Sequence, residues 1–190
     1  MTTVTVNGLG QFNNTIQSHD LGNHLVAALV ADQAHSVVDV NGIGNVVEMV
    51  DSPDSVIRLT GNDNVATTYS ADTMVFLNGV ANSVLITGNN DTVNVLGVNN
   101  EITLSIAPGA VVVDHGLGTI FNVDGTNLTI QDFARDPTGL INLYGVPPAQ
   151  AVAAEQSDGH GGTLLIVSNI DGAHTIDFVG DPHVAISHFV

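Results

Sequence analysis

The sequence predicts an all-β protein, a right-handed parallel β-solenoid built from nine-residue blocks. Its composition, with 44% apolar but only 4% aromatic residues, is rich in Val and Thr, which favour strands, and in Gly and Asn, which favour turns. In addition, a turn-forming half and a half with alternating apolar residues recur through eleven consecutive blocks of nine, from Gln33 to Gln131.

Each block ends in a short strand with apolar residues at alternate positions, so that they share one face. A unit this small cannot bury that face alone, but stacked turns spaced roughly 4.8 Å apart bury it between neighbours. The seventh position carries Ile57, Ala66, Val75, Val84, Val93, Ile102, Val111 and Ile120, and the ninth carries Leu59, Leu77, Ile86, Val95, Leu104 and Val113.

The number of blocks in one turn of the solenoid stays open at this point. The strings NGVANSVLI and LGVNNEITL match at a separation of 18 residues, which indicates two blocks per turn. The strings TGNDN, from Thr60, and TGNND, from Thr87, match at 27 residues, which indicates three.

The segments before and after the eleven blocks are predicted to cap and to extend the solenoid. Residues 1–32 are expected to form an N-terminal strand and a helical cap, with the short helix in Asn23–His35. Residues 132–190 are expected to form a β-rich region that continues or caps the solenoid, without a linker before it. Its predicted strands are 139–144, 162–167, 174–179 and 184–190, with a short helix or loop at 147–156.

The turns predict a ladder of stacked amides at the fifth block position. Asparagine tolerates left-handed backbone geometry, and its side chain bonds neighbouring backbone groups. Thr73 and Asp91 stand at the same position of intervening blocks. The predicted ladder residues are Asn64, Asn82, Asn100 and Asn127.

Charge and composition exclude several functional classes. The net charge is −17, and the only two basic residues are Arg58 and Arg135, so phosphate-based binding to nucleic acid is excluded. No apolar run approaches the roughly 20 residues of a membrane span, and we expect no membrane insertion. The absence of cysteine excludes disulfides, thiol catalysis and cysteine zinc sites.

Candidate catalytic groups are sparse, and we predict no enzyme and no catalytic residue. The acidic pair Asp51 and Asp54 lies in a turn, where carboxylates are usually solvated. Ser157, Asp158 and His160 are neighbours in a Gly-rich loop, an arrangement that rarely has triad geometry.

The C-terminal histidines are the one other candidate group. Their spacing matches no compact zinc signature, so we expect exposed side chains. They are His160, His174, His183 and His188, with Asp158, Asp171 and Asp181 nearby.

Two segments resemble bacterial proteins with glycine-rich nonapeptide calcium repeats that leave the cell by type I secretion. The string TGNNDTVNVLG (87–97) is similar to a degenerate form of their repeat, and most glycines of that motif are missing here. The strings IQDFARDPTGLINLYGV (130–146), DGHGGTLLIV (158–167) and HTIDFVGDPH (174–183) are similar to their C-terminal region.

The resemblance implies export without a cleaved N-terminal signal, through a type I secretion signal in 132–190. Residues 1–10 indeed lack the basic and apolar regions of a signal peptide. It also implies calcium as the cofactor, bound by turn carboxylates. The candidate ligands are Asp63, Asp72, Asp91, Asp114 and Asp124.

The expected function is that of a secreted bacterial structural protein of the extracellular matrix, such as that of a biofilm, or of the cell surface. We expect it to associate with itself, end to end into filaments in one version, with calcium or salt screening its acidic surface. A matrix or cell-surface polysaccharide is the other expected partner. The alternatives are an exported calcium-binding or glycan-binding adhesive module and a polysaccharide-active enzyme.

Overall fold

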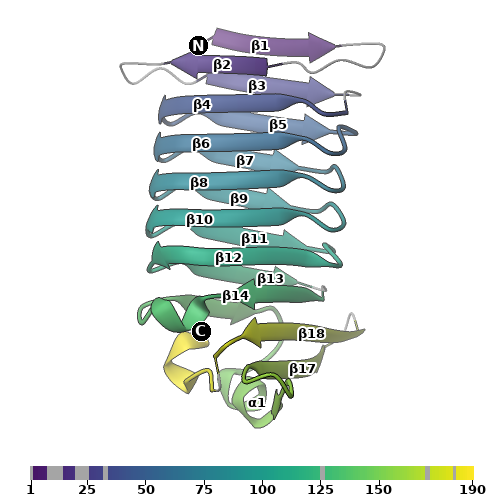
Figure 1. Ribbon diagram of the computed structural model, residues 1–190, viewed down its shortest axis with the longest axis vertical. Helices are drawn as coiled ribbons and strands as arrows, with labels where there is room; N and C mark the ends of the chain where they lie inside the picture. Colours follow the sequence, from purple (N-terminus) through teal and green to yellow (C-terminus); the bar gives the residue numbers. More distant parts are fainter. Residues whose placement is uncertain are drawn as a thin grey trace.

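The computed structural model describes the backbone of residues 2–7, 15–19, 26–31, 34–124, 127–169, 172–181 and 183–190. Side chains are described for 34–124, 127–151, 154–167, 175–181, 183–185 and 187–190. The fold is nearly all-β, with 56% strand and 6% helix, and its parallel sheets form a β-solenoid of about 6 turns (Figure 1). The predicted fold class is confirmed.

Two sheets form the walls of the solenoid. The first sheet contains, in order, β1 (Thr2–Asn7), β3 (Val26–Ala31), β5 (Val46–Val50), β7 (Val65–Thr68), β9 (Ser83–Ile86), β11 (Glu101–Ser105), β13 (Ile120–Asp124) and β15 (Leu140–Leu143). The second sheet contains β2 (Thr15–His19), β4 (Val37–Ile43), β6 (Val56–Asn62), β8 (Met74–Val80), β10 (Thr92–Val98), β12 (Ala110–Leu117) and β14 (Leu128–Gln131), followed by β18 (Gly172–Val179), β17 (Thr163–Asn169) and β16 (Glu155–Ser157).

Each turn of the solenoid uses two blocks, one for each sheet. Val56 pairs with Met74 and Met74 pairs with Thr92, all in parallel register. Equivalent residues on neighbouring turns are therefore 18 residues apart here, and 19 at other turns. This register settles the open question in favour of two blocks. In Figure 1 the second sheet faces the viewer and runs leftward, the first runs rightward behind it, and the chain descends, so the coil is right-handed.

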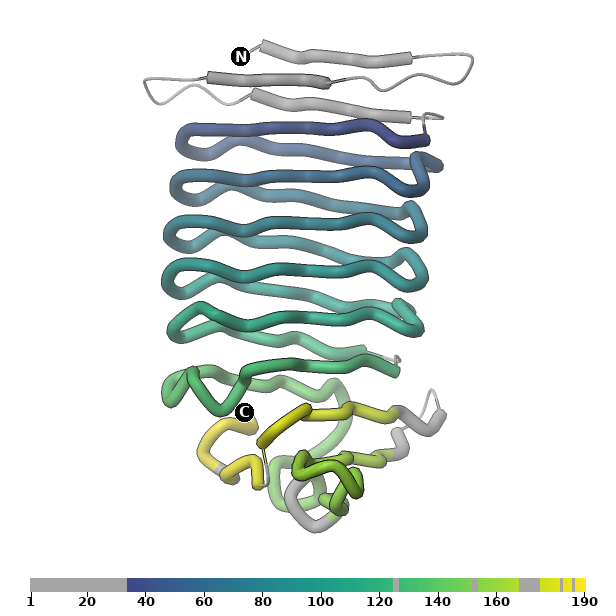
Figure 2. Tube along the Cα trace, viewed as in Figure 1, coloured from purple at the N-terminus to yellow at the C-terminus, as the bar shows by residue number. Residues whose placement is uncertain are grey.

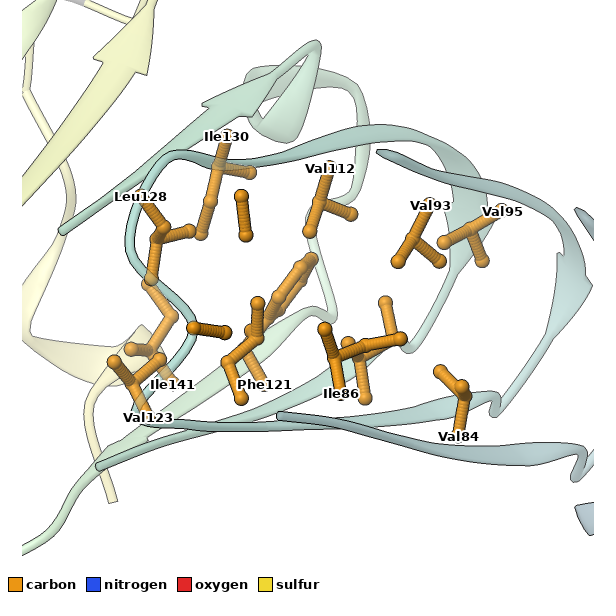
Figure 3. Packing of buried hydrophobic residues seen from close by; sticks show 14 of the residues in the cluster. Val84, Ile86, Val93, Val95, Val112, Phe121, Val123, Leu128, Ile130 and Ile141 are labelled. Carbon is orange, nitrogen blue, oxygen red and sulfur yellow. The ribbon is translucent and has the colours of Figure 1, made fainter. Parts of the chain in front are cut away.

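The core lies between the two sheets and is made of the alternating apolar residues. Val75, Leu77, Val84 and Ile86 have no exposed surface. Figure 3 shows how such side chains from opposite walls, among them Val84, Val93 and Val112, point into the shared interior. Burying a side chain of this size contributes about 1.5–3 kcal/mol, and each turn repeats the gain.

The nine-residue phase slips by one residue before β12. Glu101 and Val111 hold equivalent strand positions ten residues apart, because six residues separate Leu104 from Val111 where five separate Ile86 from Thr92. A one-residue slip moves every side chain to the opposite face. The prediction that Val111, Val113 and Ile120 are core residues is therefore wrong, since they lie on the outward side and are only half-buried. Val112 and Phe121 take the buried places.

The predicted N-terminal helix in Asn23–His35 is wrong. Residues Val26–Ala31 form β3, which pairs in parallel with β1 and β5. A short apolar run does not distinguish a buried strand from a helix, and here the open edge of β5 supplies backbone partners that override helix propensity. The described strands of residues 1–32 thus continue the solenoid.

The C-terminal region lies across one end of the stack (Figure 2). β18 (Gly172–Val179) pairs with β14 in parallel, and β17 (Thr163–Asn169) pairs antiparallel with β18 and with β16 (Glu155–Ser157). These strands, with α1 (Pro148–Ala153), confirm the β-rich extension. The predicted strand at 184–190 is wrong: that segment holds the short 3-10 helix η2 (Ile186–His188) and a single bridge from Phe189 to Ile141.

Aromatic packing joins this region to the solenoid core. The 3-10 helix η1 (Phe133–Arg135) inserts the buried Phe133 against Phe121 and Phe178, with ring centroids 5.8 and 5.6 Å apart. Phe189, next to the end of the chain, is also buried. The solenoid is therefore closed at its C-terminal end by apolar side chains of the region that follows it.

Candidate functional site

One corner of the solenoid holds a ladder of asparagines, here called the asparagine ladder (Asn45, Asn64, Asn82, Asn100). All of them are fully buried. The Oδ1 of Asn64 accepts a hydrogen bond from the backbone N–H of Asn45, and the same relation joins Asn82 to Asn64 and Asn100 to Asn82, each at 3.0 Å. The ladder thus provides acceptors for backbone N–H groups in a turn, where these groups have no hydrogen-bond partner on a neighbouring strand.

A glycine three residues before each ladder asparagine makes this corner possible. The Nδ2 of Asn82 donates to the carbonyl oxygen of Gly61 on the preceding turn at 3.0 Å. A Cβ on Gly79 would lie 1.9 Å from that same oxygen, so only glycine fits there. This Gly-x-x-Asn pattern recurs once per turn in the sequence, but the block positions alone single out only the asparagines.

Asn127 is not part of the ladder, and its assignment there is wrong. It is exposed, and its Oδ1 accepts a hydrogen bond from the backbone N–H of Thr175 at 2.9 Å. The buried carboxylate of Asp136 instead serves the turn that follows Asn100. Its oxygens accept from the backbone N–H groups of Gly118 and Thr119, both at 2.8 Å.

The opposite corner carries a second buried column, here called the hydroxyl column (Ser36, Ser55, Thr73, Asp91). The Oγ of Ser55 accepts from the backbone N–H of Ser36 at 3.0 Å, and Oδ1 of Asp91 accepts from that of Thr73 at 2.7 Å. Asp91 thus holds the place that neutral hydroxyl groups hold on earlier turns. Its charge is not required for this hydrogen bond.

Asp91 is a buried carboxyl group with an incomplete set of partners. Its Oδ2 is buried and has no hydrogen-bond partner among the described residues. Burial raises the pKa of Asp91 to about 7, and the neighbouring Asp72 adds to the rise, although the bond from Thr73 acts in the opposite direction. Asp91 therefore titrates near neutral pH.

Asp114 is the second buried carboxyl group. Its Oδ1 accepts from the backbone N–H of Gly116 at 3.0 Å and from the hydroxyl of Thr119 at 2.9 Å. In the part of the chain that is described, its buried Oδ2 has no partner. Burial raises its pKa despite these two bonds.

The five predicted calcium ligands do not gather at one site. Asp63 is exposed at the corner of the asparagine ladder, and Asp72 is exposed at the opposite corner. Asp91 is buried beside Asp72, Asp114 is buried within β12, and Asp124 ends β13. Within the described residues no group of three or more His, Cys, Asp or Glu side chains is placed to hold a metal ion. Calcium binding by these residues stays a prediction.

The two predicted carboxylate and triad arrangements are local turn features. Asp51 and Asp54 are exposed residues of one turn, both with positive φ angles, of 48° and 55°. In the loop after β16, the side chains of Ser157 and Asp158 accept hydrogen bonds from the backbone N–H groups of Gly159 and His160. These bonds order the loop, and the bonds that Asp158 accepts from the backbone N–H groups of His160 and Gly162 lower its pKa.

The histidines whose side chains are described bind individual partners. Nδ1 of His183 lies 2.7 Å from Oε2 of Glu155, and Nδ1 of His188 lies 2.7 Å from the carbonyl oxygen of Gly139. Asp181 accepts from the backbone N–H of His183 at 3.2 Å. The side chains of His174 and Asp171 lie outside the described residues. The His183–Glu155 pair could not be read from the sequence because its members are 28 residues apart.

The outward sides of the two sheets differ in charge. On the first sheet, Glu48 and Glu101 are exposed, and Nδ2 of Asn122 donates to Oε1 of Glu101 at 2.6 Å. The outward side of β4, β6, β8, β10 and β12 is here called the apolar face. Its exposed large apolar side chains are Ile43, Met74, Val80, Leu96, Val98 and Leu117.

Comparisons with known proteins found no matching family model, no similar curated protein and no similar solved structure. Among the described residues, no helix has the length and apolar character needed to cross a membrane.

Proposed function

We propose that this protein is a non-catalytic structural component of the bacterial extracellular matrix or cell surface, and that it associates with itself. The observation that carries the proposal is that each set of repeated residues has a structural role. The asparagine ladder and the hydroxyl column are buried and bond backbone groups, and the alternating apolar residues fill the core. The repeats therefore build a rod with flat sides, which suits a scaffold.

Export by type I secretion is part of the proposal and rests on the resemblance of residues 132–190. In the folded protein this region is packed on the solenoid, with Phe178 and Phe189 buried. A signal within it would be accessible only before the chain folds. The proposed route is therefore export of the unfolded chain, followed by folding outside the cell.

Self-association through the sides of the rod fits the structure better than end-to-end stacking. The C-terminal region covers one end of the solenoid, where β15 ends the first sheet and contacts η2, and β18, β17 and β16 extend the second sheet beyond β14. A copy stacking on that end would have to displace apolar packing around Phe133. We therefore do not carry the filament version of the prediction forward.

In the proposed function, cations screen the negative charge of the protein. The net charge of −17 makes copies repel each other at low ionic strength. Exposed turn acids such as Asp54, Asp63 and Asp72 contribute to this repulsion. Calcium or another salt would weaken it, and no individual calcium site is assumed.

Cell fractionation tests the proposal. In a bacterium that carries the gene, the full chain is expected in the matrix and surface fractions, and a chain truncated after Gln131 is expected to stay inside the cell. A full-length chain confined to the cytosolic fraction would overturn the proposal. Equal export of both chains would refute only the assignment of the export region.

A further inference from the structure

We infer that the apolar face is the surface through which two copies of this chain form a symmetric side-by-side dimer. This inference rests on the proposed function and specifies the contact for the self-association proposed there. The face extends over five neighbouring strands, β4 to β12 of the second sheet, which lie toward the viewer in Figure 1.

The face is nearly free of charge in a strongly acidic protein. The outward residues of β8 and β10 are Met74, Phe76, Asn78 and Val80, and Thr92, Asn94, Leu96 and Val98. Those of β12 are Val111, Val113, His115 and Leu117, since Asp114 points inward and is fully buried. Three neighbouring strands thus present no carboxylate outward.

The charges at the border of the face are compensated locally. The outward carboxylate of Asp39 on β4 pairs with Arg58 on β6 at 3.0 Å, and the Arg58 guanidinium lies 5.5 Å from the centre of the Phe76 ring. The carboxylate of Asp132, which lies 3.0 Å from His115 on β12, pairs with Arg135 at 3.3 Å. The border therefore offers little net charge to an approaching molecule.

The distribution of charge favours a second copy of this chain as the molecule that binds to the apolar face. Two chains of −17 repel each other most where acids are exposed, at the turns and on the first sheet, which carries Glu48 and Glu101. The apolar face is where this repulsion is smallest and where burial of Met74, Leu96 and Leu117 gains most. A basic partner would instead be drawn to the acidic turns.

The geometry of the face also fits itself. Its side chains form ridges at the strand spacing of the solenoid, so identical ridges interdigitate when two such sheets pack face to face. Seven-residue strands in a row of five make a face of roughly 24 Å by 23 Å, or about 1,100 Å² for two copies together. That area lies at the lower limit of specific interfaces, so the dimer is expected to be weak and reversible.

Sedimentation equilibrium of the full chain tests the inference, over about 5 to 500 µM protein and at roughly 20 and 500 mM NaCl. A monomer–dimer equilibrium that tightens with salt is expected, since salt screens repulsion and strengthens apolar contact. Met74→Glu and Leu96→Glu should each weaken dimerisation roughly tenfold or more. Val65→Glu is the matched control, because Val65 is 39% exposed on the first sheet and Met74 is 40% exposed on the second.

A cysteine cross-link provides a second test that does not depend on a destabilising charge. The chain contains no cysteine, so Asn78→Cys places a single thiol near the middle of the apolar face. Under mild oxidation it should form a disulfide-linked dimer well below the concentration at which Thr67→Cys, on the first sheet, does so.

A protein that remains monomeric at all these conditions would overturn the inference, as would a dimer that Val65→Glu disrupts and Met74→Glu leaves intact. Cross-linking through Thr67→Cys in preference to Asn78→Cys would also overturn it. The proposed function is tested separately, by the location of the protein in cell fractions. A matrix protein that is monomeric and a cytosolic protein that dimerises are distinguishable results.

Discussion

The backbone N–H of Thr73 donates to Oδ1 of Asp91 on the following turn of the solenoid, at 2.7 Å. Both residues are buried, and two turns earlier the equivalent acceptor is the hydroxyl of Ser55, which accepts from the backbone N–H of Ser36. A carboxyl group therefore occupies a position that neutral groups fill elsewhere. This places an ionisable group within the repeated framework of the fold.

Asp91→Asn is expected to stabilise the protein at about pH 8, by about 1–3 kcal/mol. The amide keeps an acceptor for Thr73 and removes a charge whose burial raises the pKa of Asp91 to about 7. Chemical denaturation of both proteins measures the difference. Asp63→Asn, at an exposed turn position, is the control and should change stability little. A loss of stability in Asp91→Asn at this pH would contradict the account.

The wild-type protein should become more stable as the pH falls from about 8 to about 5. Burial raises the folded-state pKa of Asp91 to about 7 from an unfolded value of 3.8, so the folded state binds the proton more tightly. The gain begins as pH falls through the folded pKa and is complete below the unfolded one. Asp114, whose pKa is also raised, adds in the same direction.

The double variant Asp91→Asn, Asp114→Asn separates this effect from the general relief of charge repulsion. Its free energy of unfolding should depend on pH much less steeply than that of the wild type over this range. Equal slopes for the two proteins would show that neither buried carboxyl group is responsible.

Asn82→Ala should destabilise the protein by about 2–4 kcal/mol. The change removes the acceptor for the backbone N–H of Asn64 and the donor to the carbonyl oxygen of Gly61, both in a buried corner. Asn127→Ala, at an exposed position outside the ladder, is the control. Thermal and denaturant unfolding measure both, and a similar small effect for the two would refute a structural role for the ladder.

Gly79→Ala should destabilise the protein severely, by more than about 3 kcal/mol, or prevent folding. Its Cβ would lie 1.9 Å from the backbone oxygen of Gly61, which the stacked turn cannot move. Gly44→Ala is the matched control, since Gly44 also has a positive φ but a Cβ added there would have no atom within 4 Å. That variant should lose only about 1 kcal/mol, from backbone strain. Circular dichroism and melting curves distinguish the two.

Ala81→Asn should stabilise the protein by about 0.5–1 kcal/mol. Ala81 has a φ of 56°, in the left-handed region that asparagine tolerates better than alanine, and Asn99 holds the equivalent place on the next turn with a φ of 54°. Ala71→Asn, at a turn residue without a positive φ, is the control. A gain in the control alone would contradict the assignment of strain to Ala81.

The repeating chemistry of the sequence was sufficient to predict the solenoid and its core. Alternating residues such as Val75 and Leu77 face inward as expected, because a period of two maps directly onto the two sides of a strand. The slip before β12 was not predictable from the blocks. Val111, Val112 and Val113 are chemically equivalent, so only backbone register decides which of them is buried.

The buried columns were predictable only in part. Asn64, Asn82 and Asn100 stand out by spacing, but Asn127 shares their block position and lies elsewhere, because it precedes β14 of the second sheet whereas the ladder residues precede strands of the first sheet. The raised pKa of Asp91 depends on burial, which a turn-forming string does not reveal. The apolar face was not predictable because equivalent residues on its neighbouring strands are 18 or 19 positions apart in the sequence and meet only when the turns stack.

The measurement that tests the central claim most directly is immunogold electron microscopy of cells that carry the gene, with a deletion strain as the control for antibody specificity. The account predicts gold particles over extracellular material or the outer cell surface, and no label in the deletion strain. Label confined to the cell interior would contradict the proposal that this solenoid is a structural component outside the cell.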